Sequence, residues 1–182
     1  MSRPTTQRLC RTAAFAGFVL IAGLAADKGK GILFPDWSKP TKGSYDKPAA
    51  EIGKKATQDQ PWSVTTVTSS ISGKPVSGEP VVAVGEIIDI SCYLQVGKHG
   101  DKHRDCGQKC ARHGQPIGLL TEEGNVYTLI DEEHDPRRDG DTELRDELID
   151  HMAEVVKVHG TMTEVAGQKA IYITGTAKPK KK

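Results

Sequence analysis

The sequence of 182 residues is poor in aromatic side chains, has almost no net charge and contains only four cysteines. Because only 36% of the residues are hydrophobic and 5% aromatic, a polytopic membrane protein is excluded and the core must be modest. A formal net charge of +1 creates no global field that would attract nucleic acid or acidic substrates. The chain also lacks a serine nucleophile elbow, a phosphate-binding glycine loop and a C-x-x-C-H motif, which excludes the enzyme and haem-protein classes built on them.

One long apolar run, residues 13–26, lies near the N-terminus behind three arginines: Arg3, Arg8 and Arg11. A basic region before an apolar stretch of this length is typical of a secretory signal peptide, which would comprise residues 1–26. The run is shorter than the about 20 residues of a bilayer-spanning helix, although an uncleaved anchor and a buried core helix remain alternatives. We therefore expect an exported protein, periplasmic or anchored at the outer face of the cytoplasmic membrane.

Residues 27–80 are rich in proline and glycine and show no sustained helical or strand periodicity. Both tryptophans of the chain fall in this segment. We interpret it as an extended arm that docks its aromatic side chains onto a partner or onto its own domain, with a flexible tether as the alternative. The docking candidates are Phe34, Trp37, Tyr45 and Trp62. At the other end of the chain, residues 177–182 form a short basic tail.

The folded domain is predicted over residues 81–176. Alternating apolar residues predict a first strand with a bulge at Gly85, beside Glu86. The side chains expected on its inner face are Val82, Val84, Ile88, Ile90, Cys92 and Leu94. Residues 116–121 and 125–131 predict two further strands, joined by a turn over 122–124, and residues 155–165 and 168–175 predict a final hairpin.

One short helix is expected between the third and fourth strands. Asp141 is its predicted N-cap, and its apolar stripe consists of Leu144, Leu148, Ile149 and Met152. This order predicts a mainly β fold, an OB-like five-stranded barrel with a Cys/His-rich helical insertion between strands 1 and 2. An N-terminal apolar helix and the extended arm would precede the barrel. A small α+β sandwich is the alternative.

Three of the four cysteines and three of the six histidines cluster in the connection between the first two strands: Cys92, His99, His103, Cys106, Cys110 and His113. From His99 onward these residues recur every three or four positions, which on a helix places them along one face, and Cys92 could approach that face. Thiolate and imidazole are ligands that zinc and copper prefer. A disulfide among the three thiols, in an oxidising compartment, is the structural alternative. Thiol redox chemistry at Cys106 and Cys110 would require an exposed thiolate of low pKa.

The chain resembles a family of small exported bacterial OB-like domains that have no well-established activity. The resemblance covers residues 81–175 and rests on residues 85–94 and on the motif His103-x2-Cys106-x3-Cys110-x3-Gly-x-Pro. In that family Cys92, His103, Cys106 and Cys110 match recurring positions, which implies that these four would be the first ligands of any metal. His99 and His113 are then additional candidates particular to this sequence. The resemblance implies no reaction.

We expect a non-enzymatic accessory or scaffolding subunit that docks on a membrane protein complex, of an energy-converting kind, through its arm and its OB-like domain. The arm of more than about 50 residues is the main reason, since a free soluble binder has little use for it. The alternative function is an exported zinc- or copper-binding protein that uses the Cys/His cluster. Zinc, copper or no cofactor at all is consistent with the sequence, and no nucleic-acid partner is expected.

Overall fold

The computed structural model describes residues 38–55, 62, 64–131 and 142–173. The predicted leader, Phe34, Trp37 and the basic tail lie outside these residues. The strands are β1 (Glu51–Ile52), β2 (Glu79–Asp89), β3 (Ile117–Leu120), β4 (Val126–Asp131), β5 (Val155–Val165) and β6 (Gln168–Ile173). The helices are α1 (Val64–Ser69), α2 (Ile90–Val96), α3 (Arg104–Arg112) and α5 (Glu143–Asp150), with short 3-10 turns η1 (Ile71–Gly73) and η2 (Asp101–His103).

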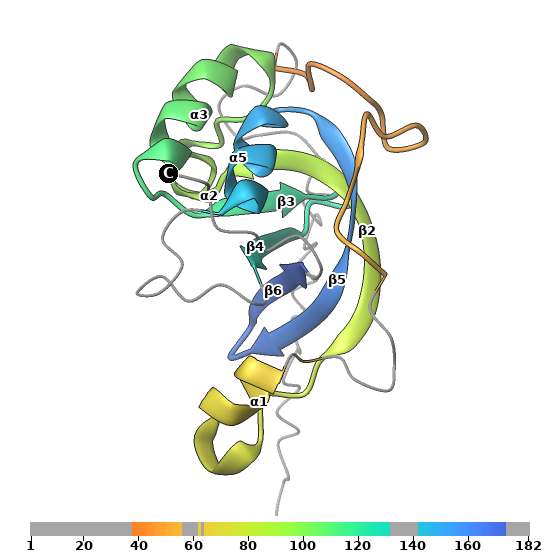
Figure 1. Ribbon diagram of the computed structural model, residues 1–182. Helices are drawn as coiled ribbons and strands as arrows, with labels where there is room; N and C mark the ends of the chain where they lie inside the picture. Colours follow the sequence, from red (N-terminus) through yellow and green to blue (C-terminus); the bar gives the residue numbers. More distant parts are fainter. Residues whose placement is uncertain (1–37, 56–61, 63, 132–141, 174–182) are drawn as a thin grey trace, which may run out of the picture.

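Five of the strands form a closed barrel. Strands β2, β3 and β4 make an antiparallel meander, β6 pairs parallel with β4, and β5 pairs antiparallel with both β6 and β2. Strand β1 is additional and lies parallel to β5. This arrangement, with α5 between β4 and β5 and with α2, η2 and α3 between β2 and β3, is consistent with the predicted OB-like fold (Figure 1).

The predicted apolar stripe of the helix is confirmed, since Leu144, Leu148, Ile149 and Met152 are all buried in the core. The helix begins one residue later than predicted, however, because Thr142 is its N-cap and accepts a hydrogen bond from the Arg145 amide at 3.3 Å. Asp141 lies outside the described residues. The final hairpin is also confirmed, and Ala166 and Gly167 in its turn both have positive φ, as a tight two-residue turn requires.

The first barrel strand differs from its prediction in three ways. It ends at Asp89, so the residues beyond, including Cys92 and Leu94, lie on helix α2 and not on a strand. Its register with β5 runs unbroken past Gly85, which excludes the predicted bulge. Its inner face in the first half consists of Val81 and Ala83, while Val82 is 51% exposed. Both faces of this strand carry apolar residues, so the alternation of residue types could not show which face is buried.

Part of the predicted arm lies against the barrel's own strand β5. The Thr41 amide donates to the Ala153 carbonyl at 2.7 Å, and the Lys157 amide donates to the Ala50 carbonyl at 2.9 Å. Strand β1 continues this contact, and its Ile52 is fully buried in the core cluster. The part of the arm from Thr41 to Ile52 is therefore a structural component of the barrel.

Two of the proposed docking aromatics are described. Trp62 is buried and packs edge-on against Tyr172 of β6, with ring centroids 5.1 Å apart. Tyr45 is half-buried. Burial and the nearby Glu86 carboxylate raise the pKa of Tyr45 to about 12. The contact that the structure shows for Trp62 is thus with the chain's own domain.

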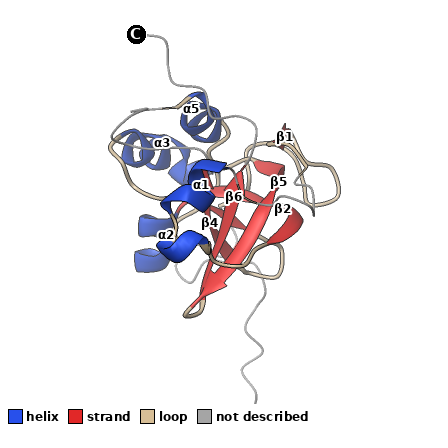
Figure 2. Cartoon of the chain, turned by 60° about the horizontal axis from the view of Figure 1, so that its bottom comes forward, coloured by secondary structure: helices blue, strands red, loops and turns tan. Residues whose placement is uncertain are grey.

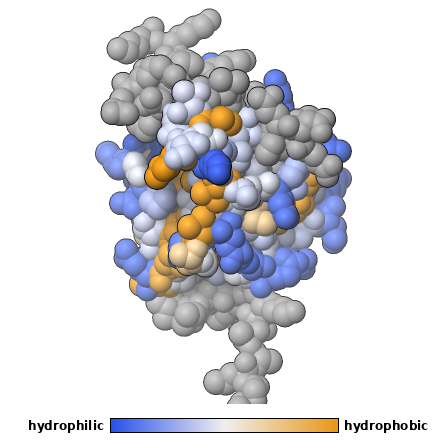
Figure 3. All heavy atoms as spheres, turned by 90° about the horizontal axis from the view of Figure 1, so that it is seen from below, coloured by the Kyte–Doolittle hydropathy of each residue, from blue (hydrophilic) through white to orange (hydrophobic). Residues whose placement is uncertain are grey.

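The helices occupy opposite ends of the barrel. Helices α3 and α5 lie together at one end, with α2 beside α3, and α1 lies at the other end (Figure 1). Figure 2, in which the α1 end is turned toward the viewer, again shows α3 and α5 side by side. Apolar side chains remain exposed on the face that includes the α1 end, as Figure 3 shows, and the exposed apolar residues of α1, η1 and the segment that follows are Val67, Ile71 and Val76. Among the helices of the described segments, none is long and apolar enough to cross a bilayer.

Candidate metal centre

Helix α2 carries Cys92 and is started by the carboxylate of Asp89. The Asp89 Oδ1 atom accepts hydrogen bonds from the amides of Ser91 at 2.9 Å and Cys92 at 3.4 Å, which satisfies two of the free donors of the first turn. The helix ends at Gly97, whose φ of 69° is the left-handed conformation that glycine adopts without steric cost. Cys92 therefore lies in the first turn of α2, and that turn is fixed to the end of β2.

Helix α3 carries Cys106 and Cys110 on adjacent turns. Its buried side consists of the small residues Gly107 and Ala111, and a Cβ added at Gly107 would lie 3.1 Å from the side chain of Met152. Because successive residues rotate by about 100° around a helix, packing Gly107 and Ala111 against the α5 side leaves Cys106 and Cys110 on the neighbouring face. Arg145 of α5 fixes the end of the helix through a 2.6 Å hydrogen bond to the Ala111 carbonyl.

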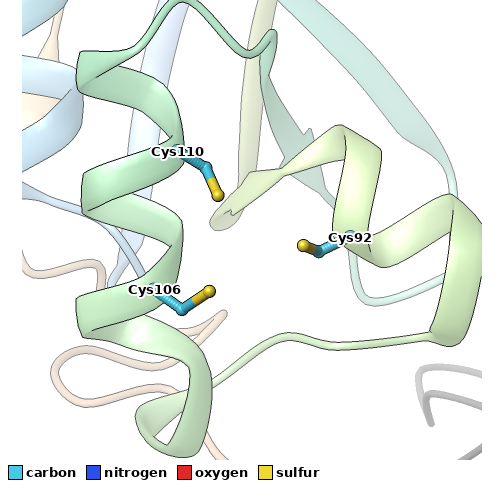
Figure 4. Close-up of side chains that lie close together, drawn as sticks. All are labelled: Cys92, Cys106 and Cys110. Atoms are coloured by element: carbon cyan, nitrogen blue, oxygen red, sulfur yellow. The ribbon is translucent and has the colours of Figure 1, made fainter.

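The three thiols converge from these two helices. Cys92 points from α2 toward Cys106 and Cys110 on α3 (Figure 4), and the three sulfur atoms all lie within 4.8 Å of one another. All three cysteines are free, so the predicted alternative of a disulfide among them is not what this structure contains. Cys106 is exposed and the other two are partly buried, which leaves the cluster open to solvent on one side.

A second group of donors shares Cys92 with the first. The Asp89 carboxylate, the Cys92 sulfur and a ring nitrogen of His103 also lie within 4.8 Å of one another. His103 Nε2 is 3.9 Å from Asp89 Oδ2, and both atoms are buried without a hydrogen-bond partner in the described part of the chain. Sequence reasoning named His103 but missed Asp89, although an acidic residue three positions before a candidate cysteine was the available signal.

His99 and His113 belong to neither donor group of the described residues. His99 lies in the loop before η2, not on a helix with the cysteines, so the prediction of one continuous helical face is wrong for this residue. Its Nδ1 pairs at 3.0 Å with the buried carboxylate of Glu86, which also accepts a 2.6 Å hydrogen bond from the Gly100 amide. His113 is exposed at the end of α3. This pair joins β2 to the loop that carries His99. The sequence around Glu86 is apolar and did not indicate that the two residues would meet.

The surroundings favour the uncharged form of several donors. Burial and the adjacent Asp89 carboxylate raise the pKa of Cys92 to about 12, and the same causes raise the pKa of Cys110. Burial lowers the pKa of His103, which favours the neutral imidazole that binds metal ions. A raised pKa at Cys110 is the opposite of what the thiol oxidoreductase hypothesis requires.

Chemically, this arrangement suits a soft or borderline metal ion. In a tetrahedral zinc site with Zn–S bonds of about 2.3 Å, the sulfur atoms lie about 3.8 Å apart, so thiols within 4.8 Å need only small side-chain rotations. A bound cation also removes the thiol protons, which reverses the effect of the Asp89 carboxylate on the cysteines.

Comparison with known proteins identified no relative of this chain. No protein-family model matches the chain, and searches of curated proteins and of solved structures found no match.

Proposed function

We propose that this chain is an exported metal-binding domain whose primary ligands are the thiolates of Cys92, Cys106 and Cys110, and that its ion is zinc or copper(I). The observation that carries the proposal is the convergence of three unbonded sulfur atoms from two helices. Thiolate ligands select zinc and copper(I) over hard cations such as magnesium and calcium. In this proposal the chain binds and carries an ion and catalyses no reaction.

The local architecture supports this function. Two separate devices, the Asp89 cap of α2 and the Gly107 packing of α3, fix the helices that present the thiols. Preorganised ligands lower the conformational cost of binding an ion. The exposed side at Cys106 gives an ion or a donor protein direct access, as carriage or sensing of a metal requires.

The test is a metal titration of the reduced full chain, carried out in a Cys10→Ser background so that the fourth cysteine contributes nothing. We expect zinc and copper(I) to bind in competition with a chromophoric chelator, and Cys106→Ser or Cys110→Ser to weaken the binding at least about tenfold. The matched control is His113→Ala, which changes a metal-binding side chain on the same segment outside the thiol group and should leave the affinity unchanged. Equal affinity in the cysteine variants and the parent chain would refute the proposal.

An accessory subunit of a membrane complex is the second candidate function. The observation that favours it is the exposed apolar surface around Val67, Ile71 and Val76, at the opposite end from the thiols, where Ile71 is 90% exposed. Exposed apolar patches are frequent at protein contacts. If this surface docks on a membrane complex, Ile71→Asp should abolish co-migration with that complex in native membranes and leave metal affinity unchanged. Unaltered co-migration of the variant would count against this candidate.

A further inference from the structure

Two buried polar atoms beside the thiol cluster have no partner in the described part of the chain. Asp89 Oδ2 and His103 Nε2 are both enclosed, since the Asp89 side chain is 0% exposed and that of His103 is 7% exposed. An unsatisfied buried polar group costs about 1–3 kcal/mol, so such atoms in a folded protein call for an explanation. Their mutual distance of 3.9 Å is too long for a hydrogen bond and leaves room for an ion between them.

These two atoms and the sulfur of Cys92 form a donor triad of their own. The three cysteine sulfurs lie within 4.8 Å of one another, and so do the donor atoms of Asp89, Cys92 and His103. The five donor atoms do not all lie within 4.8 Å of one another. One ion at the centre of the three thiols therefore leaves Asp89 and His103 unpartnered. Cys92 alone belongs to both groups.

We propose that Asp89, Cys92 and His103 hold a second divalent ion, and that the Cys92 thiolate bridges it to the ion of the three thiols. This inference rests on the proposed function for the first ion. Binding releases the three thiol protons to solvent, and the second ion takes a carboxylate oxygen, an imidazole nitrogen and a shared sulfur, with water in any remaining position. The centre then has five protein donors and two ions.

Charge balance supports two ions. Three thiolates and one carboxylate carry four negative charges in a partly buried site, and two zinc ions neutralise them. A single zinc ion at the three thiols would leave the Asp89 carboxylate, whose side chain is 0% exposed, without a metal counter-ion, which is costly for a buried charge. Because a carboxylate oxygen is a hard donor that zinc accepts and soft copper(I) does not favour, we expect the second position to take zinc in preference to copper(I).

The experiment is native mass spectrometry of the reduced full chain with the Cys10→Ser substitution, loaded with zinc and freed of weakly bound ions by a mild chelator. We expect two zinc ions in the parent chain, one in Asp89→Asn, one in His103→Ala and two in the control His113→Ala. Asparagine is as good a helix N-cap as aspartate, so Asp89→Asn removes the charge and keeps the start of α2. Circular dichroism confirms that each variant is folded, and if His103→Ala is not, Asp89→Asn decides.

X-ray absorption of the zinc-loaded parent chain gives an independent measurement. A shared sulfur places the two ions within about 3.5–4 Å of each other, which adds zinc–zinc scattering to the spectrum. One ion in the parent chain, two ions in Asp89→Asn, or no zinc–zinc scattering would each overturn the two-ion centre. If no zinc binds, the two-ion centre fails, and the proposed function fails as well only if copper(I) also does not bind in the chelator titration, so the two failures are distinguishable.

Discussion

Truncating Ile52 to alanine is expected to destabilise the whole barrel, although this residue belongs to a two-residue strand outside the predicted domain. Ile52 is 1% exposed and lies in the main core cluster, within the strand that pairs parallel with β5. The substitution removes three carbon atoms, worth about 2.4 kcal/mol at about 0.8 kcal/mol for each buried methylene. A residual cavity adds to this, so we expect the free energy of unfolding to fall by about 3 kcal/mol.

The matched control is Ile71→Ala, which removes the same three carbon atoms from a side chain that is 90% exposed. Its effect should stay within about 0.5 kcal/mol. Urea unfolding of the full chain, followed by circular dichroism, measures both values. If the two variants lose the same stability, the arm does not belong to the cooperative unit and the reasoning from burial is wrong.

Three further predictions concern the charged contacts and the thiols. Arg104 donates hydrogen bonds to the Met152 and Asp150 carbonyls and to the Glu154 carboxylate. Arg104→Ala should therefore lower the free energy of unfolding, measured in urea, by about 2 kcal/mol. Arg104→Lys should recover only part of this loss, because lysine lacks the guanidinium fork. Burial alone would raise the pKa of Glu154, but hydrogen bonds from His151 and Arg104 lower this pKa below its ordinary value of 4.5. The free energy of unfolding should therefore fall as the pH drops below about 4.5. Glu154→Gln should make this fall smaller when the free energy of unfolding is measured across acid pH. Zinc should slow alkylation of the exposed Cys106 at least about tenfold in peptide mapping, with EDTA restoring the rate, whereas an unchanged rate would mean that this thiol is no ligand.

Much of the barrel could be predicted because its later strands carry strong local signals. The strand β5 was predicted at its observed bounds, and the turn at Ala166–Gly167 marks its hairpin with β6. The apolar stripe of α5 has the spacing of a helix that buries one face. Each of these features depends on residues close together in the sequence.

The failures have a different physical origin. Cys92 and Leu94 follow a run of strand-forming residues, and the hydrogen bonds of the Asp89 side chain to the amides of Ser91 and Cys92 cap a helix there. A side chain that bonds to nearby backbone amides thus favours a helix start over continuation of the strand, which the apolar pattern does not reveal. At the candidate site, the residue types predicted the cluster of cysteines, but its division into two donor groups depends on tertiary positions that spacing does not determine.

The parallel pairing of β1 with β5 also constrains the order in which the chain can fold. Glu51 contacts Lys157 across 106 residues of sequence, so this contact requires the closing of a very long loop. Because β1 pairs with β5 over two residues, whereas β2 pairs with it over eight and β6 over five, we infer that β1 docks late, after β5 has been placed by these neighbours. Until then the backbone groups of β5 that receive the arm face solvent, and an open strand edge is a template for pairing with other chains. The arm therefore covers a strand edge that would otherwise be open for pairing with another chain.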